Sequence, residues 1–318
     1  MKNAICVVTG GSGFIGSNLV RKLLAEGAVV RVVDNFSTGR RENIEEIAAA
    51  ITLIEGDIRD NDLMHRAFQG ATYVFHEAAV PSVPRSVENP SEAISVAADG
   101  TVSVLEAARD AGVSKVVYAA SSSAYGNQSD LPKHEGQRPD PLSPYAVGKL
   151  AGEHLCRAFW ECYGLETVAL RYFNVFGPRQ DPNSPYGAVI PKFISALMRK
   201  VRPTVFGDGK QSRDFTFVEN VVAANLAAAK TQDTKGRAVN VACGTSYTLL
   251  DLLDQLKVLF DRQDIQPIFE PERPGDVRHS MADISAAKSL IGYEVTTDFA
   301  EGLKQTVEWY QTQPIPNN

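Results

Sequence analysis

A glycine-rich turn near the N-terminus is the feature that most limits how this chain can fold. The apolar run at residues 4–8 leads into TGGSGFIG at residues 9–16, so Gly10, Gly13 and Gly16 lie between a predicted strand and a predicted helix. Because glycine has no Cβ atom, the chain can turn tightly here and its backbone can approach a pyrophosphate at the helix N-terminus. The turn therefore predicts a dinucleotide-binding α/β unit.

Strand-like and helical patterns alternate through the first half of the chain. Mostly apolar, β-branched runs predict buried strands at residues 4–9, 29–34, 51–55, 72–76, 115–120 and 166–172. Helical periodicity occurs between them, at residues 13–26, 60–68, 92–111 and 144–163. This alternation predicts an α/β fold with a doubly wound parallel sheet of the Rossmann type and right-handed crossovers.

The composition of the sequence changes beyond about residue 175, where prolines and glycines become frequent. Short helical segments are predicted at residues 189–199, 218–229, 249–260 and 299–311. We predict a smaller, interleaved α/β lobe that closes over the carboxyl ends of the strands, where such sheets bind ligands. The expected division gives residues 1–174 and 215–242 to the dinucleotide-binding domain, and residues 175–214 and 243–318 to a substrate-binding lobe.

Composition excludes several classes of function. The net charge of −6 argues against a nucleic-acid surface, and it means that an anionic ligand would need local arginines. The chain has no apolar run of about 18 residues and no signal peptide pattern, so we expect no membrane span. The cysteines show no metal-ligand spacing, which favours reduced thiols in a cytoplasmic protein: Cys6, Cys156, Cys162 and Cys243.

An acidic residue at the end of the second predicted strand indicates which dinucleotide binds. The Asp34 carboxylate would accept hydrogen bonds from the adenosine ribose hydroxyls and would repel a 2′-phosphate, which favours NAD over NADP. The neighbouring Arg40 and Arg41 argue mildly for the opposite preference. An ordinary turn with a capping aspartate is the alternative interpretation.

Two short segments after the third and fourth predicted strands could also contact the cofactor. Asp57 and Ile58 could reach the adenine, and the backbone of Ala78 and Ala79 could lie against the cofactor. Ordinary loop packing is the competing explanation for these four residues.

A tyrosine and a lysine supply the candidate chemistry. Tyr145 and Lys149 are four residues apart in a predicted helix, so their side chains share a face. An unperturbed tyrosine, with a pKa of about 10, is a poor base at neutral pH. One ammonium group at ~4 Å is worth roughly 4 kcal/mol at an effective dielectric of ~20, which would lower that pKa by up to ~3 units. We therefore predict that Tyr145 is a general base near pH 7, assisted by a serine of the triplet 121–123; a solvated helix pair is the alternative.

Taken together, these motifs resemble the extended short-chain dehydrogenase/reductase superfamily and, within it, UDP-hexose 4-epimerases of the UDP-N-acetylglucosamine 4-epimerase type. The resemblance covers nearly the whole chain. The segments that carry it, besides the turn and the Tyr145/Lys149 pair, are DN (34–35), GDI (56–58), HEAA (76–79), SSSAYG (121–126), RYFNVFGP (171–178), SRDFTFV (212–218) and RPGDVRHS (273–280).

The resemblance implies tightly bound NAD and a catalytic triad of Ser121, Tyr145 and Lys149. Gly10, Gly13, Gly16 and Asp34 match the family's cofactor fingerprint. The further positions that the resemblance assigns to cofactor binding are Phe14, Ile15, Asn35, Ser37, Gly39, Asp57, Ile58, Ala78, Ala79, Tyr145, Lys149 and Tyr172.

The resemblance also implies a UDP-sugar site that supplies the local arginines demanded by the negative net charge. Ser82, Ser121, Ser123 and Tyr145 would lie against the sugar. The positions matched to the nucleotide are Asn174, Arg213 and Arg273 at the diphosphate, Phe206 at the uracil and Asp276 at the ribose, with Ala188, Val189, Lys192 and Val205 around them.

Particular positions bear on the substrate and on NAD binding. In the family, the position of Ser280 lines the pocket beside the sugar C2 substituent, and a small residue there admits an N-acetyl group. Related enzymes usually carry asparagine where this chain has Ala97, which removes one expected polar contact to the cofactor, and galactose-pathway epimerases often carry lysine in place of Pro81.

The predicted function is therefore NAD-dependent 4-epimerisation of UDP-hexoses through a 4-keto sugar, with UDP-GlcNAc/UDP-GalNAc as substrates and UDP-Glc/UDP-Gal turned over as well or more weakly. An enzyme restricted to non-acetylated sugars is one alternative. A UDP-glucuronate 4-epimerase or decarboxylase is another, for which Arg85 and Arg278 could bind the carboxylate. A 4,6-dehydratase would carry Asp-Glu in place of Ser122 and Ser123, and an NAD-sensing module would typically lack the Tyr145/Lys149 pair.

The family resemblance also implies a cytoplasmic homodimer. The expected contact runs through the predicted helices at residues 92–111 and 144–163. We expect no metal ion and no nucleic-acid partner.

Overall fold

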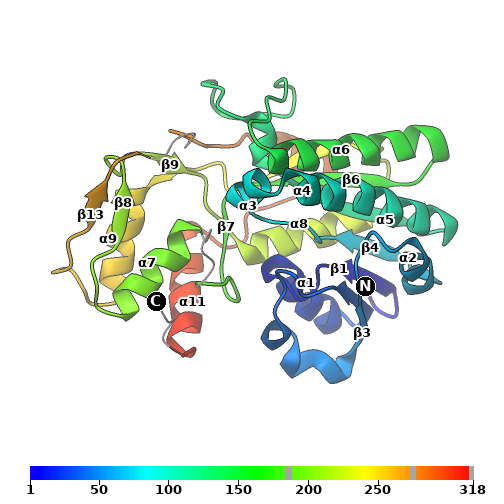
Figure 1. The fold of residues 1–318 in the computed structure, drawn as a ribbon, viewed down its shortest axis with the longest axis horizontal. Helices are drawn as coiled ribbons and strands as arrows, with labels where there is room; N and C mark the ends of the chain where they lie inside the picture. Colours follow the sequence, from blue (N-terminus) through cyan, green and yellow to red (C-terminus); the bar gives the residue numbers. More distant parts are fainter. Residues whose placement is uncertain (183–187, 273–276, 315–318) are drawn as a thin grey trace.

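A seven-stranded sheet with the order β11-β6-β5-β4-β1-β2-β3 forms the centre of the molecule, and every neighbouring pair in it is parallel (Figure 1). The structure is a computed structural model that describes residues 1–182, 188–272 and 277–314. The strands of this sheet are β1 (Ile5–Thr9), β2 (Val29–Asp34), β3 (Ile51–Glu55), β4 (Tyr73–His76), β5 (Lys115–Ser121), β6 (Thr167–Tyr172) and β11 (Ala238–Val241). The predicted doubly wound Rossmann-type sheet is confirmed.

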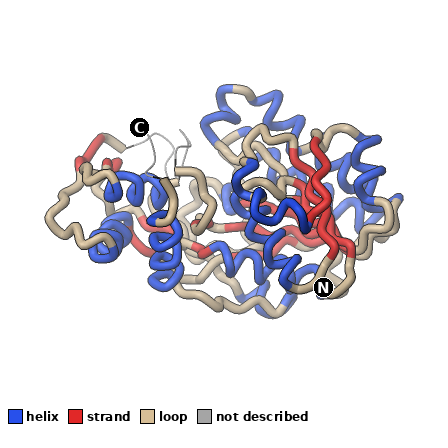
Figure 2. The backbone as a smooth tube through the Cα atoms, turned by 90° about the horizontal axis from the view of Figure 1, so that it is seen from below, coloured by secondary structure: helices blue, strands red, loops and turns tan. Residues whose placement is uncertain are grey.

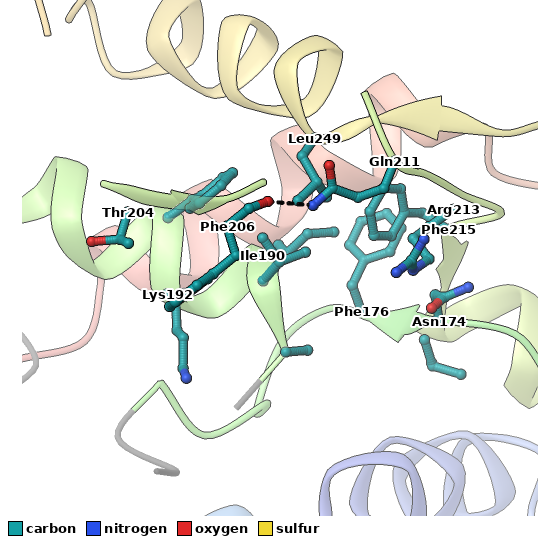
Figure 3. Close-up of a pocket in the computed structure, with 14 residues that line it drawn as sticks. Asn174, Phe176, Ile190, Lys192, Thr204, Phe206, Gln211, Arg213, Phe215 and Leu249 are labelled. Atoms are coloured by element: carbon teal, nitrogen blue, oxygen red, sulfur yellow. Dashed lines mark hydrogen bonds between the residues drawn. The ribbon is translucent and has the colours of Figure 1, made fainter. Parts of the chain in front are cut away.

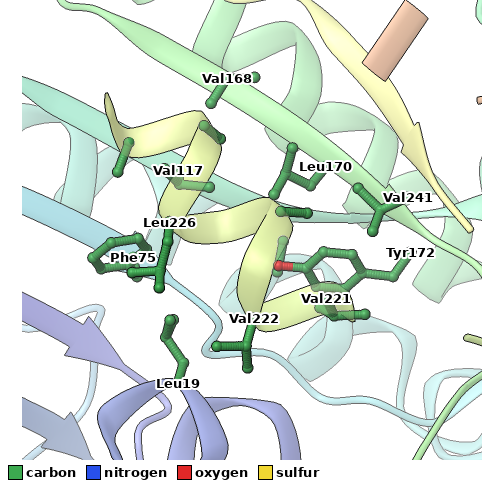
Figure 4. Packing of buried hydrophobic residues seen from close by; sticks show 14 of the residues in the cluster. Leu19, Phe75, Val117, Val168, Leu170, Tyr172, Val221, Val222, Leu226 and Val241 are labelled. Atoms are coloured by element: carbon green, nitrogen blue, oxygen red, sulfur yellow. The ribbon is translucent and has the colours of Figure 1, made fainter. Parts of the chain in front are cut away.

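Helices cover both faces of this sheet. One face carries α1 (Phe14–Ala25), α8 (Val218–Lys230) and α10 (Ser285–Ile291); the other carries α2 (Asn61–Phe68), α5 (Asp99–Asp110) and α6 (Pro144–Tyr163). Successive strand side chains point to opposite faces, so Val32 packs in one hydrophobic cluster and Val33 in the other. Figure 4 shows α8 crossing the strands, with Leu226 near Phe75.

A smaller lobe lies beside the sheet and has its own hydrophobic cluster (Figure 2). Its helices and short strands are α7 (Val189–Met198), α9 (Leu249–Leu259), α11 (Phe299–Gln311), β7 (Val175–Phe176), β8 (Thr204–Phe206), β9 (Ser212–Arg213), β10 (Thr216–Phe217), β12 (Tyr247–Thr248) and β13 (Ile268–Glu270). Between these segments the chain returns to the main sheet, where Ala287 and Ile291 of α10 join the core. The exact division into two domains stays a prediction.

The region between β4 and β5 differs from its predicted form. The single helix expected at residues 92–111 is wrong, since the chain departs from regular helix at Ala98 (φ −97°, ψ −62°). The helix that ends there, α4 (Pro90–Ala97), begins after its capping residue Asn89. Ala97 of α4 packs tightly on α6, since a Cβ atom added to Gly148 would lie 2.7 Å from the Ala97 Cβ. The further helices are α3 (Val83–Glu88) and the short 3-10 helices η1 (Arg41–Asn43), η2 (Glu45–Ala50) and η3 (Ser122–Tyr125).

Within the described ranges of the chain, no group of His, Cys, Asp and Glu side chains could hold a metal ion. No helix in the same ranges is long and apolar enough to cross a membrane. All four cysteines have free thiols, and Cys6 and Cys156 are buried.

A buried ion pair joins the sheet to the helix that carries the candidate catalytic residues. Arg171 on β6 donates to both carboxylate oxygens of Glu153 on α6, at 2.7 to 3.2 Å. The Arg171 guanidinium also lies 4.8 Å from the ring centre of Tyr125, whose hydroxyl donates to Asn240 at 2.7 Å. Because the charges are buried together, the position of α6 on β6 depends on both partners.

We expect Arg171→Leu to lower the free energy of unfolding by about 3–5 kcal/mol, because the Glu153 carboxylate would be left buried without its partner. Urea denaturation measures the change. The matched control is the double variant Arg171→Leu/Glu153→Leu, in which no charge is stranded and the loss should be much smaller. An equal loss in the single and double variants would contradict this account.

Candidate active site

The first cavity at the carboxyl edge of the sheet matches the predicted cofactor site. It has a volume of about 190 Å³ and lies against the ends of β1, β2, β3 and β4. The predicted cofactor residues that line it are Gly10, Gly13, Phe14, Ile15, Gly16, Asp34, Asn35, Ser37, Gly39, Asp57, Ile58, Ala78 and Ala79. The other three, Tyr145, Lys149 and Tyr172, line the adjoining cavity.

The glycine-rich turn leaves no room for side chains. A Cβ atom added to Gly16 would lie 2.2 Å from the Gly10 carbonyl oxygen, and one added to Gly10, whose φ is +69°, would lie 2.7 Å from the Ala78 backbone. Gly13 is the N-cap residue of α1 and has no side chain to cap it, so the first-turn N–H groups remain open to an anion. This open helix N-terminus fits a pyrophosphate.

The Asp34 carboxylate is oriented by the backbone around it. It accepts hydrogen bonds from the N–H groups of Ser12 at 2.8 Å and Phe36 at 2.9 Å. The two arginines that could favour NADP both form ion pairs with acidic side chains. Arg41 pairs with Glu55 at 2.6 Å, and Arg40 contacts acidic side chains on two sides, Glu42 and Asp181. The geometry therefore fits NAD.

A larger cavity, of about 720 Å³, adjoins the cofactor cavity and holds the predicted catalytic residues. The two cavities adjoin, because they share five lining residues: Phe14, Ile15, Glu77, Ala79 and Pro81. The predicted catalytic and substrate residues that line the larger one are Ser121, Ser123, Tyr145, Lys149, Asn174, Ala188, Arg213 and Ser280.

The start of α6 holds Tyr145 in this cavity. Ser143 caps the helix by accepting from the Ala146 N–H at 3.2 Å. The Tyr145 N–H donates to the hydroxyl of Ser86, a buried α3 residue that sequence reasoning missed, at 3.1 Å. On the strand side, the Ser121 hydroxyl accepts from the Ser123 hydroxyl at 2.9 Å.

Burial shifts the pKa values of both Tyr145 and Lys149. Burial raises the pKa of Tyr145; a hydrogen bond with Ser121 opposes the rise, and the Glu77 carboxyl adds to it. Burial also lowers the pKa of Lys149 to about 8, and its ammonium donates to the Ala119 carbonyl at 2.6 Å. The prediction for Tyr145 combined Lys149, the nicotinamide cation and a serine, but it left out the burial of the phenol, which is the largest influence on the pKa of Tyr145 in the structure.

A third cavity, of about 250 Å³, lies in the second lobe (Figure 3). Asn174 and Arg213 line both this cavity and the larger one, so the larger cavity adjoins both of the others. Among the predicted substrate residues, those that line the third cavity are Asn174, Ala188, Val189, Lys192, Phe206 and Arg213. Sequence reasoning missed Gln211, which also lines it and donates to the Phe206 carbonyl at 2.7 Å.

Four predicted substrate residues are not found among the lining residues. Val205 is fully buried in the lobe. Ser82 lies outside the lining of all three cavities, and its hydroxyl accepts from the Arg85 N–H at 3.1 Å at the start of α3. Arg273 and Asp276 fall outside the described residues.

Comparison with known proteins identifies the family. The sequence profile of the NAD dependent epimerase/dehydratase family matches residues 6–242. The chain belongs to this family. This confirms two predictions: that the chain is an epimerase that uses NAD, and that it is of the extended short-chain dehydrogenase/reductase type.

Individual members of the family align over nearly their full length. A UDP-glucose 4-epimerase of Mycolicibacterium smegmatis is 38% identical and aligns over 96% of this chain and 98% of its own. A UDP-N-acetylglucosamine 4-epimerase of Methanobrevibacter ruminantium, solved with UDP-N-acetylmuramic acid, is 41% identical with a TM-score of 0.94, over 99% of this chain and 100% of its own. A UDP-glucose 4-epimerase of Thermus thermophilus, solved with NAD, is 34% identical with a TM-score of 0.86, over 97% and 99%.

We expect Gly16→Ala to lose NAD, because its Cβ atom would overlap the Gly10 carbonyl at 2.2 Å and distort the turn that receives the pyrophosphate. NAD affinity should fall at least about tenfold, equivalent to roughly 1.4 kcal/mol. The NAD content of the purified protein and titration with added NAD measure the effect. Gly136→Ala, in a loop outside the cofactor cavity, is the control that should keep its NAD; equal NAD affinity in both variants would contradict the role of the turn.

Proposed function

We propose that this chain catalyses the NAD-dependent 4-epimerisation of UDP-hexoses, with UDP-GlcNAc and UDP-GalNAc as its preferred pair and UDP-Glc and UDP-Gal as further substrates. The observation that carries the proposal is the series of three adjoining cavities. Tyr145 and Lys149 line the middle one, which adjoins the cofactor cavity on one side and the cavity of the second lobe on the other. A sugar nucleotide bound along this series would have its sugar beside Tyr145.

In this proposal Tyr145 moves the proton of the sugar 4-hydroxyl. Its phenolate takes up that proton when C4 is oxidised, and the resulting phenol returns it when C4 is reduced; Ser121 shares the proton through their hydrogen bond. The chemistry that NAD supplies when bound is acceptance of the C4 hydride and its return, together with a ring cation that favours the phenolate. The charge of Lys149 favours the phenolate in the same way. The volume of about 720 Å³ gives the 4-keto sugar room to turn over before reduction on its other face.

The second lobe would hold the nucleotide. Asn174 and Arg213 line the junction of the larger and third cavities, which suits the diphosphate, and Phe206 lines the third cavity with other aromatic side chains, which suits the uracil. The roles assigned to Arg273 and Asp276 rest on the family resemblance alone. For Ser82 and Val205, a direct contact with the substrate has no support from the cavities.

The residues around the sugar favour acetylated over carboxylated substrates. Ser280 lines the larger cavity and leaves space beside the sugar, which supports the acetylated pair. The arginines considered for a C6 carboxylate are engaged elsewhere. Arg85 pairs with Glu92 at 2.9 Å, and Arg278 pairs with Asp208 at 2.6 Å. A UDP-glucuronate 4-epimerase or decarboxylase is therefore the less favoured alternative.

The proposal includes a homodimer in the cytoplasm. α4, α5 and α6 pack side by side along one flank of the sheet (Figure 1), and Val147 of α6 is exposed there. A second copy packed on this flank would cover α6 and support the helix that carries Tyr145 and Lys149.

We expect Tyr145→Phe to lower turnover of the best UDP-sugar roughly 10²-fold or more, because the variant loses the positioned acid–base group. The fold and the NAD content should be unchanged. Tyr163→Phe is the matched control, since Tyr163 is on the same helix, is 56% exposed and should leave turnover intact. If Tyr145→Phe kept more than about a third of wild-type activity, the catalytic assignment would be wrong.

We expect Ser280→Tyr to lower kcat/KM for UDP-GlcNAc and UDP-GalNAc by about 10-fold or more while sparing UDP-Glc and UDP-Gal, because a bulky ring would overlap the N-acetyl group. A panel of the four sugars measures the ratio. Ser289→Tyr, at an exposed α10 position outside the cavity, is the control. An unchanged ratio in Ser280→Tyr, or a wild type inactive on UDP-GlcNAc, would overturn the substrate assignment.

A further inference from the structure

A half-buried acidic residue that the proposed mechanism does not use lies where the cofactor cavity adjoins the larger cavity. Glu77 follows the last residue of β4, and its N–H donates to the Thr9 carbonyl at 3.1 Å. Its side chain lines both the cofactor cavity and the larger cavity, which it shares with Tyr145 and Lys149. A carboxyl group at this junction can act on the charges of both catalytic residues.

The Glu77 carboxyl is fixed by a directed chain of hydrogen bonds. The Asn225 amide of α8 donates to the Tyr172 hydroxyl at 2.8 Å, and the Tyr172 hydroxyl donates to Glu77 Oε1 at 2.7 Å. Because Asn225 already donates to the Tyr172 oxygen, the Tyr172 proton is directed to Glu77. Tyr172, itself held by Asn225 of α8, thus fixes the Glu77 carboxyl group at the cavity wall.

Glu77 is also the carboxyl group best placed to balance the charge of Lys149. Two acidic residues, Glu77 and Glu153, raise the pKa of Lys149 against its burial. Glu153 is bound at both oxygens by Arg171, which already neutralises it. Among the described residues, Glu77 has no cationic side chain within ion-pair distance, so its charge acts on Lys149 across the cavity.

We propose that Glu77 is a positioning residue that keeps the Lys149 ammonium charged. In this way it sets the pH range in which Tyr145 exchanges a proton with the sugar, an inference that rests on the proposed function. Burial raises the pKa of Glu77 to about 7, while the Tyr172 hydrogen bond and the Lys149 charge oppose this rise. Glu77 therefore changes its charge within the range in which the enzyme would work.

The other titratable groups near Glu77 do not replace it. His76 is buried and its pKa is lowered to about 3, so its ring is neutral; its two nitrogens are hydrogen-bonded to Thr9 and Thr101. Lys133, Arg213 and His279 line more of the same cavity, while the groups that act on the Glu77 carboxyl are Tyr172 and Lys149, and Glu77 in turn acts on Tyr145. The pH response is therefore expected to follow Glu77.

The test compares the pH dependence of kcat in wild type and in Glu77→Gln, which keeps an acceptor for the Tyr172 hydroxyl but removes the charge. Without the carboxylate, Lys149 loses its proton at a lower pH, so the alkaline limb should move down by about one pH unit. On the acidic limb Lys149 keeps its charge in both proteins, so the direct effect of Glu77 on Tyr145 decides the sign. Because Glu77 raises the pKa of Tyr145, the variant's Tyr145 should ionise at a lower pH, and the acidic limb moves the same way. A profile lowered by the same factor at every pH, with both limbs unmoved, would overturn the proposal.

Two further variants test whether the shift of the limbs comes from the charge of Glu77 and not from its packing. Glu77→Asp retains the charge and should keep its limbs near those of wild type, and it also serves if Glu77→Gln does not fold. Glu308→Gln removes an exposed carboxylate from α11 outside all three cavities and should leave the profile unchanged. Limbs displaced equally in Glu77→Asp and Glu77→Gln would assign the effect to packing and overturn the proposal.

A spectroscopic titration separates this inference from the proposed function. The near-ultraviolet absorbance of the Tyr145 phenolate, obtained by subtracting the Tyr145→Phe spectrum, should reach its midpoint at a lower pH in Glu77→Gln than in wild-type holoenzyme. An equal midpoint overturns the role of Glu77 even where epimerase activity is found. If the wild type epimerises no UDP-sugar, the proposed function fails, and a shifted midpoint still supports the coupling of Glu77 to Tyr145.

Discussion

The parallel pairing of β1 with both β2 and β4 is the constraint on which the rest of the structure depends. Because all seven strands are parallel, their carboxyl ends meet at one edge, and the chain turns in opposite directions from β1. The turn after β1, Glu77 after β4 and Ser121 at the end of β5 consequently face a common space. The second lobe closes this space and adds Asn174 and Arg213.

Burial, more than the spacing of charges, sets the acid–base behaviour of the site. It raises the pKa of Tyr145 and Glu77 and lowers that of Lys149, so each of these groups is pushed toward its neutral form. Hydrogen bonds and opposite charges then restore part of the charge. A site built this way depends on groups outside the catalytic triad, including the Arg171–Glu153 pair that holds α6 and occupies one of the two carboxylates near Lys149.

Much of the fold could be predicted from sequence because hydrophobic periodicity is local. The strands at 29–34 and 51–55 and the helix Pro144–Tyr163 have the predicted bounds. The break at Ala98 could not be predicted from periodicity, since the apolar pattern continues through it. Strand β11 was missed because only its pairing with β6, far away in the sequence, identifies it. For the candidate site, the lining of the cavities includes most of the predicted residues, whereas the buried Val205 shows that a match to a motif does not imply exposure.

The sequence by itself determined the chemistry that is available: a glycine turn that admits a pyrophosphate, a carboxylate for the ribose, and a tyrosine and a lysine on one helical face. These are local properties of spacing and side-chain type. Only the tertiary structure decided which groups act on one another. Glu77 and Tyr172 are 95 residues apart and Arg171 and Glu153 are 18 apart, yet each pair is hydrogen-bonded, the first partly buried and the second fully buried. Burial strengthens electrostatic interactions because it lowers the dielectric, and burial is a property of the whole fold.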